Sequence, residues 1–201
     1  AEQFDAIIVG GGPAGLSAAL WLGRYRRTTL VVDGGEPRNE PAWAVHGYPG
    51  IVDPTPVELR RRLFQQAQGE GVEMRGGDVV SAEGSKGDFR VRLETGEMFA
   101  AHRLVLAYGL RDYVPDIDGV AELYGTSVFH CADCDGPSVA DTRIGVIGRD
   151  RHGANLALYL RHFSDDVTLL THGRPAELKA AGLDTLDQAG IDIVEEHIRR
   201  L

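Results

Sequence analysis

Residues 4–15 read FDAIIVGGGPAG, a short apolar run followed by three glycines and then Pro-Ala-Gly. An apolar run of this length, bounded by glycine, is typical of a buried β-strand. Residues 14–25 follow with a helical composition, and residues 28–33, TTLVVD, form a second apolar run that ends on an acid. The order strand, glycine turn, helix, strand predicts the opening of a doubly wound α/β sheet.

The glycine turn matches the pattern G-x-G-x-x-G at Gly10, Gly12 and Gly15. The first glycine of this pattern permits a tight turn, the second lets the backbone approach a pyrophosphate at the helix N-terminus, and the third lets the helix pack on the strand. Asp33 ends the second strand, where an acid binds a ribose 2′-hydroxyl and repels a 2′-phosphate. These residues favour a dinucleotide-binding site over the alternative of a purely structural turn. Because of Asp33, the expected dinucleotide is FAD or NAD rather than NADP.

The rest of the chain predicts a β-meander and then a second α/β unit. After a Pro- and Gly-rich loop, the expected elements of the first part are a helix at 56–70 and strands at 72–74, 79–83, 89–93, 98–100 and 104–107. Beyond a boundary at 113–119 we expect a strand at 143–147, a helix at 153–163, a strand at 166–170, two short helices and a strand at 191–194. The predicted fold is therefore α/β, with two Rossmann-like units, parallel sheets and an added antiparallel meander. The predicted domains are residues 1–113 and 114–201.

Composition excludes several classes of function. The 201-residue chain has a formal net charge of -9, which disfavours nucleic acid as a partner because phosphate binding needs a basic face. Arg60, Arg61 and Arg62 are interpreted as a solvated helix face. No apolar run approaches the roughly 20 residues of a membrane span. Two cysteines cannot build a disulfide scaffold, and we expect a cytoplasmic protein.

The two cysteines lie close together in the stretch Cys131-Ala-Asp-Cys134-Asp135-Gly136. Cysteines at this spacing can close a small disulfide, and a helix beginning near Cys134 would depress the pKa of a thiol. Asp135 could carry a proton during thiol-disulfide exchange. Zinc needs four ligands, and only His130 is adjacent, so we expect no metal site. A pair of inert buried cysteines is a further alternative to the redox pair.

Together these motifs resemble the low-molecular-weight thioredoxin reductases, class II pyridine nucleotide-disulfide oxidoreductases. The resemblance covers essentially all 201 residues and rests on GGGPAGLSAA at 10–19, LAYG at 106–109 and CADCDG at 131–136. It implies that FAD binds the first unit, that the cysteine pair opens a second, NADPH-type unit, and that the protein is a homodimer. It also implies that the substrate is a thioredoxin-like protein or a small dithiol or disulfide.

The resemblance also assigns roles to individual residues. Cys134 would attack the flavin C4a, Cys131 would exchange with the substrate disulfide, and Asp135 would act as acid and base. The implied cofactor-binding residues are Gly10, Gly12, Pro13, Ala14, Gly15, Asp33, Gly34, Arg38, Asn39, His46, Val79, Ala107 and Gly109. For His46 a structural or solvent role is the alternative, and for Arg38 and Asn39 a surface turn.

Two departures from the family concern NADPH. The second glycine motif reads GRDRHG at 148–153, so Asp150 aims a carboxylate at the place of a pyrophosphate. The family's His-Arg-Arg run, which clamps the 2′-phosphate, is replaced by Thr-His-Gly-Arg at 171–174. We therefore expect a simple turn that keeps the fold without the ligand, and inefficient use of NADPH.

Further segments resemble a side branch of the family that works without NADPH, using oxygen as acceptor for dithiols or ferredoxin as donor. These segments are GEPRN at 35–39, GLRD at 109–112 with PDI at 115–117, and SDDVTL at 164–169, whereas Asp135 and Gly136 are similar to true thioredoxin reductases. The expected function is an FAD-dependent thiol-disulfide oxidoreductase not driven by NADPH. The alternatives are an NADPH-dependent thioredoxin reductase and a non-catalytic flavin-binding redox sensor.

Family members return to the flavin domain after the second unit, whereas residues 191–201 stop while that unit is still incomplete. We expect either a part of a longer protein or a shortened relative that lacks one wall of the flavin site.

Overall fold

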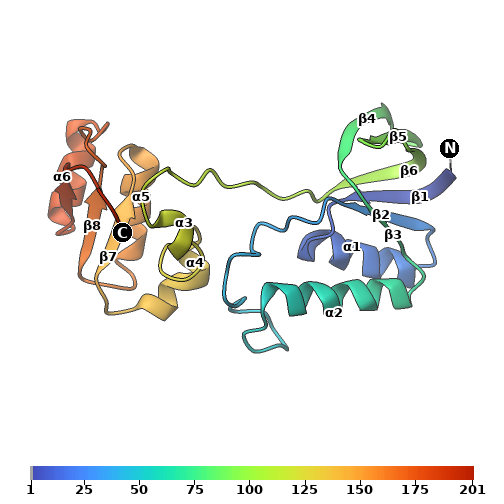
Figure 1. Cartoon of the computed structure of the whole chain (residues 1–201), viewed down its shortest axis with the longest axis horizontal. Coiled ribbons are helices and arrows are strands. Elements are labelled where there is room, and N and C mark those ends of the chain that lie inside the picture. The colour runs from blue at the N-terminus through green and yellow to red at the C-terminus, as the bar shows by residue number, and fades with distance from the viewer. Residues whose placement is uncertain (1) are drawn as a thin grey trace. The chain divides into compact units, whose positions relative to one another are not determined.

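The computed structural model describes residues 2–201, which form two compact units (Figure 1). The first unit comprises residues up to 45 and residues 54–112, and the second comprises residues 46–53 and 113–201. The interpretation of the two units as an FAD-binding and an NAD(P)H-type domain stays a prediction.

The first unit is a mixed sheet with two helices along one of its faces (Figure 1). Its elements are β1 (Glu2–Val9), α1 (Pro13–Arg24), β2 (Thr29–Asp33), α2 (Pro56–Gly69), β3 (Glu73–Gly76), β4 (Val79–Ser85), β5 (Asp88–Leu93) and β6 (Met98–Leu106). The strand order is β3-β2-β1-β6-β5-β4, in which β3, β2, β1 and β6 run parallel and β4, β5 and β6 form the antiparallel meander. The predicted α/β class, with parallel strands and a meander, is confirmed.

One strand of the first unit differs from expectation. The sequence predicts separate strands at 98–100 and 104–107, but β6 is continuous from Met98 to Leu106. The intervening His102 and Arg103 are exposed and break the apolar pattern. They stay in the strand because β1 pairs with β6 along its length, from Glu2 opposite Phe99 to Val9 opposite Leu106. Backbone pairing across the sheet therefore outweighs the local polar residues.

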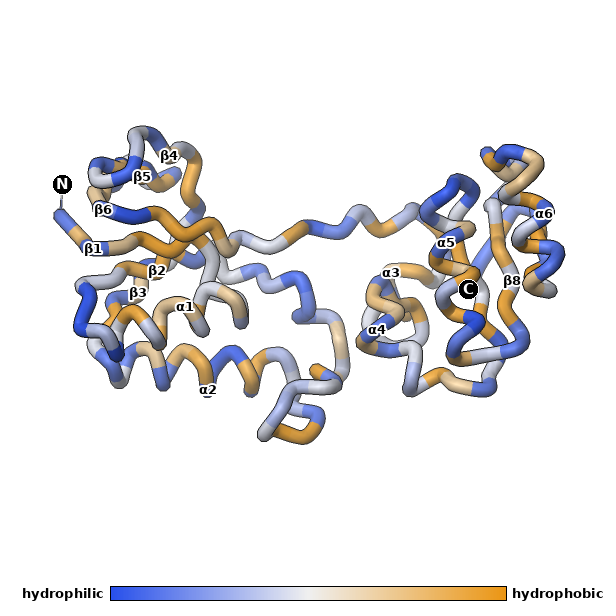
Figure 2. Tube along the Cα trace, turned by 180° about the vertical axis from the view of Figure 1, so that it is seen from behind, coloured by the Kyte–Doolittle hydropathy of each residue, from blue (hydrophilic) through white to orange (hydrophobic). Residues whose placement is uncertain are grey.

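The first core is built from side chains of the strands β1, β2, β5 and β6. It contains Phe4, Ile7, Leu30, Val32, Val91, Leu93, Phe99 and Ala101, all nearly inaccessible to solvent. Figure 2 shows apolar residues concentrated along β1 and β6, and apolar and polar residues alternating along α2. The amphipathic α2 begins where Thr55 accepts a hydrogen bond from the Glu58 N–H and Pro56 occupies the first turn.

The second unit repeats the strand-helix-strand order on a smaller sheet. Its elements are α3 (Val120–Leu123), α4 (Ala132–Asp135), the 3-10 turn η1 (Gly136–Val139), β7 (Ile144–Ile147), α5 (Arg151–Leu160), β8 (Val167–Leu170), α6 (Ala180–Gln188) and β9 (Asp192–Val194). The three strands are parallel, in the order β7-β8-β9. Where two short helices were expected after β8, the described residues contain the single helix α6, which follows an irregular stretch at 171–179.

The second core depends on Leu169, which is fully buried in β8. We expect Leu169→Ala to lower the free energy of unfolding by about 2–5 kcal/mol, because it removes methylene groups and leaves a cavity. Leu156→Ala is the matched control, because Leu156 on α5 is exposed. Urea unfolding followed by circular dichroism measures both. Equal losses in the two variants would contradict this placement of the core.

Candidate functional site

The turn between β1 and α1 requires glycine for steric reasons. Gly10 has a φ of 108°, in the left-handed region, and a Cβ atom there would lie 2.2 Å from the Ala107 carbonyl oxygen. A Cβ atom on Gly15 would lie 1.9 Å from the Gly10 carbonyl oxygen. The first residue of the pattern therefore allows the turn beside β6, and the last brings α1 against β1.

Gly12 has a different environment. It precedes α1, has an ordinary negative φ, and a Cβ atom on it would meet nothing within 4 Å. No side chain caps this helix end, and Pro13 and Ala14 in its first turn are exposed. An uncapped N-terminus presents N–H groups and a positive dipole end to an anion. The residues present here thus fit the pyrophosphate of a dinucleotide such as FAD.

Asp33 lies at the carboxyl end of β2, next to this turn. Its Oδ1 accepts a hydrogen bond of 3.2 Å from the Gly11 N–H, and its Oδ2 forms an ion pair with Arg60 of α2. The interpretation of Arg60 as part of a solvated helix face is therefore wrong, although Arg61 and Arg62 do bond to residues of their own helix. A carboxylate held this way lies ready to accept hydrogen bonds from ribose hydroxyls.

The other predicted cofactor-binding residues of the first unit lie in loops and at strand ends. The Arg38 guanidinium forms two hydrogen bonds of 2.7 Å with the Asp112 carboxylate, which joins its loop to the segment after β6. Glu36 and Arg111 make a second link of 2.5 Å between the same segments. The remaining positions are Gly34 against Asp78, Asn39 in the following turn, Val79 packed on the first core, and Ala107 and Gly109 just beyond β6.

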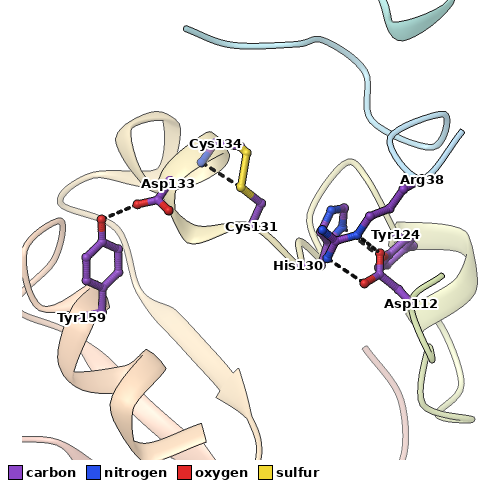
Figure 3. Close-up of a disulfide and its surroundings, with 8 residues drawn as sticks. All are labelled: Arg38, Asp112, Tyr124, His130, Cys131, Asp133, Cys134 and Tyr159. Atoms are coloured by element: carbon purple, nitrogen blue, oxygen red, sulfur yellow. Dashed lines mark hydrogen bonds and ion pairs between the residues drawn. A yellow bond between two sulfur atoms is a disulfide. The ribbon is translucent and has the colours of Figure 1, made fainter. Parts of the chain in front are cut away.

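The two cysteines form a disulfide in the second unit, with their Cα atoms 5.3 Å apart (Figure 3). The short helix α4 begins at Ala132, two residues before Cys134, which agrees with the expected helix start near Cys134. Cys131 is its N-cap, and its Sγ accepts a hydrogen bond of 3.2 Å from the Cys134 N–H. The helix is only one turn long.

Asp135 closes α4, directly after Cys134. Burial raises the pKa of Asp135 above its usual value, and the neighbouring charges of His46 and His130 oppose that rise. Residue 46 therefore belongs to the surroundings of the cysteine helix. The His46 Nδ1 atom lies 2.8 Å from an Asp53 carboxylate oxygen, and the His130 Nδ1 atom lies 2.9 Å from the Tyr124 hydroxyl.

The sequence did not single out Asp53 or Tyr159, and it gave Arg60, Asp112 and Asp133 no role as partners in these arrangements. Each meets its partner through a contact with another segment of the chain, which a local motif does not predict. Residues 2–201 contain no group of three or more His, Cys, Asp or Glu side chains placed to hold a metal ion. Within the same described part of the chain, no helix is long and apolar enough to cross a membrane.

A glycine turn open to a pyrophosphate, beside parallel strands, and a disulfide at the start of a one-turn helix are together typical of disulfide oxidoreductases that bind dinucleotides. The family model described as pyridine nucleotide-disulphide oxidoreductase matches residues 4–199. The chain belongs to this family, in its thioredoxin reductase-like part.

Similar proteins agree with this assignment. A thioredoxin reductase, tcpT, of Claviceps purpurea is 36% identical over 178 residues, which cover 84% of this chain and 56% of that protein. Among solved structures, HlmI is 36% identical with a TM-score of 0.90, over 99% of this chain and 63% of that one. An oxidoreductase from Agrobacterium tumefaciens is 37% identical with a TM-score of 0.85, over 98% and 67%. The chain spans about half the length of the curated relatives it matches.

The contrast between Gly12 and Gly15 provides a matched test of the turn. We expect Gly15→Ala to lower the free energy of unfolding of the flavin-free protein by about 3 kcal/mol, because its Cβ overlaps backbone. Gly12→Ala should cost less than about 1 kcal/mol in stability. Its methyl group would instead occupy the space of the pyrophosphate and weaken FAD binding at least about tenfold. Urea unfolding and flavin fluorescence titration measure these effects, and unchanged FAD affinity in Gly12→Ala would contradict pyrophosphate binding at Gly12.

Asp135→Asn tests the buried acid. Because the pKa of Asp135 is raised in the folded state, the folded protein binds this proton more tightly than the unfolded chain, and stability falls as pH rises above the usual value of 3.8. We expect Asp135→Asn to be more stable than the native protein at neutral pH, with a difference that vanishes as the pH falls toward that value. Thermal unfolding at several pH values measures this. The exposed Asp184→Asn should show no such convergence.

Proposed function

We propose that this chain is the flavin-binding and disulfide-bearing part of an FAD-dependent thiol-disulfide oxidoreductase that is not driven by NADPH. Bound FAD would exchange electrons with the Cys131–Cys134 pair. In dithiol oxidation the dithiol substrate would supply the electrons and oxygen would receive them, whereas with a donor such as ferredoxin a substrate disulfide would receive them. The open glycine turn at Gly12 and the carboxylate of Asp33 support FAD in the first unit.

The cysteine pair supplies the exchange chemistry. Opening the disulfide takes up two electrons and two protons, and closing it while a substrate disulfide is reduced releases them. Cys134 is exposed and Cys131 half-buried. We assign Cys134 to the flavin side and Cys131 to substrate exchange, as in the family. We assign proton transfer to Asp135, which directly follows Cys134 and whose carboxyl pKa is raised by burial.

One observation carries the proposal against NADPH. In the second glycine motif, Asp150 precedes α5, and its Oδ1 accepts hydrogen bonds from the N–H groups of His152 at 3.0 Å and Gly153 at 3.1 Å. These hydrogen bonds, that from Gly153 above all, hold the pKa of Asp150 below its usual value, so the carboxylate is charged at neutral pH. It therefore occupies the anion position at the helix N-terminus, where a pyrophosphate would otherwise bind.

The residues around this helix end support the same conclusion. Arg149, which could compensate the charge of Asp150, forms an ion pair of 3.2 Å with Glu177. At the end of β8, where the family clamps a 2′-phosphate, His172 accepts a hydrogen bond at Nδ1 from the Ile198 N–H and packs against the ring of His197. These side chains bond within the chain itself rather than forming an open cationic pocket.

The relatives named thioredoxin reductases support a thioredoxin-like protein or a small dithiol as the partner. We also propose a homodimer in the cytoplasm, on the family resemblance and the low cysteine content.

The test follows the flavin absorbance of the FAD-loaded protein without oxygen, with NADPH, then NADH, then reduced dithiothreitol and reduced thioredoxin. We expect the dithiols to bleach the flavin and the nicotinamides to leave it oxidised. Cys134→Ser should abolish bleaching by dithiols while the flavin stays bound. Bleaching by NADPH at the speed of turnover would overturn the proposal in favour of an ordinary NADPH-dependent reductase. A bound flavin that no reductant reaches would favour a redox sensor.

Asp150 variants separate charge from shape in the same assay. Asp150→Gly removes both the negative charge and the side-chain cap of α5. We expect it to raise the rate of bleaching by NADPH about tenfold or more. Asp150→Asn keeps an oxygen that can cap the helix and should gain less. Equal, unchanged rates in both variants would show that Asp150 is not the obstacle.

A further inference from the structure

Asp133 stands between the two cysteines in α4, and its side chain turns away from the disulfide (Figure 3). The hydroxyl of Tyr159, on α5, donates a short hydrogen bond to the Asp133 Oδ1 atom. This hydrogen bond and the negative charge of Asp133 raise the pKa of Tyr159 above its usual value. Tyr159 therefore keeps its proton at neutral pH and remains a hydrogen-bond donor.

Gly136, which follows Asp135 at the end of the cysteine segment, packs near Tyr159 as well. A Cβ atom on Gly136, at the start of η1, would lie 2.6 Å from the ring of Phe163. Phe163 follows α5 and meets the Tyr159 ring edge-on at a centroid distance of 6.0 Å. Tyr159 and Phe163 are thus in contact with each other, and Tyr159 bonds to Asp133 while Phe163 packs against Gly136.

The direction of the Asp133 side chain affects the reactivity of Cys134, because other charged groups lie near this cysteine. Asp133 and Asp135 flank Cys134 in sequence, and burial raises the pKa of Asp135. The histidines that act on Asp135 are His46 and His130, and His162 packs against Tyr159. A carboxylate close to a thiolate destabilises the charged form of the sulfur, and the thiolate is the form that reacts. A free Asp133 would therefore slow the chemistry of Cys134.

We propose that Tyr159 is a positioning residue that holds the Asp133 carboxylate against α5 and so keeps the thiolate of Cys134 available. The inference rests on the proposed function of the cysteine pair, but it concerns only the reactivity of the reduced thiol. It makes Asp133 and Tyr159 one coupled unit, so the effect of changing Tyr159 depends on the presence of the carboxylate.

The experiment measures the rate at which iodoacetamide alkylates Cys134 across a range of pH. All variants carry Cys131→Ser, so that only one thiol reports and the serine oxygen still caps α4. Tyr159→Phe keeps the ring and removes the hydroxyl. We expect it to lower the alkylation rate at neutral pH about threefold and to move the midpoint of the pH profile upward. Asp133→Asn should raise the rate by a similar factor. Tyr113→Phe controls for the loss of a phenol, because Tyr113 is exposed.

The double variant Asp133→Asn with Tyr159→Phe shows whether the Tyr159 hydroxyl acts through the charge of Asp133 or only through packing. If Tyr159 acts through the charge of Asp133, this variant alkylates at the rate of Asp133→Asn alone. If the loss from Tyr159→Phe is the same in both backgrounds, the hydroxyl acts only through packing and the inference is wrong. A native rate in Tyr159→Phe would also overturn it. Alkylation needs no flavin, so these outcomes are distinct from a failure of the protein to pass electrons.

Discussion

The first unit depends on the close approach of α1 to β1, which only glycine permits. Gly15 places the helix backbone against the Gly10 carbonyl, and Gly10 in turn lies against the backbone of Ala107. The carboxyl ends of β1, β2 and β6 lie together because these strands pair in parallel. The turn, Asp33 and the segment after β6 therefore meet at one edge of the sheet, where the side chains of Asp33, Arg60, Arg38 and Asp112 add further contacts.

The second unit keeps this constraint and changes what is built on it. A Cβ atom on Gly153 would lie 2.9 Å from the Cα atom of Gly148, so α5 approaches β7 as α1 approaches β1. The helix ends differ, however, because Gly12 leaves the N-terminus of α1 open whereas Asp150 caps that of α5. Packing and ligand binding are thus separate properties of the same motif. The second unit preserves the packing of helix on strand, while the Asp150 side chain takes the place that a ligand anion would occupy.

Sequence patterns predicted the parts of this structure that are set locally. Both strand-helix-strand units were predictable because short apolar runs, glycine turns and amphipathic helices carry their own signals. The continuity of β6 was not, because it depends on pairing with β1, almost a hundred residues earlier. The same holds for the site: Cys131, Cys134 and the glycines were recognisable as motifs. Their partners Arg60 and Tyr159 were not, because each reaches the site from another element.

The place of β1 in the sheet also bears on how the chain is synthesised. Among the strands of the first unit, β1 leaves the ribosome first, and its Ile7 and Ile8 are fully buried in the finished protein. Its first neighbour, β2, follows after one helix, but its other neighbour, β6, emerges only after α2 and the rest of the meander. Through that interval β1 presents an unpaired apolar edge of the kind that joins to other chains. The central strand of the nascent first unit is thus its main point of exposure to aggregation and to chaperones.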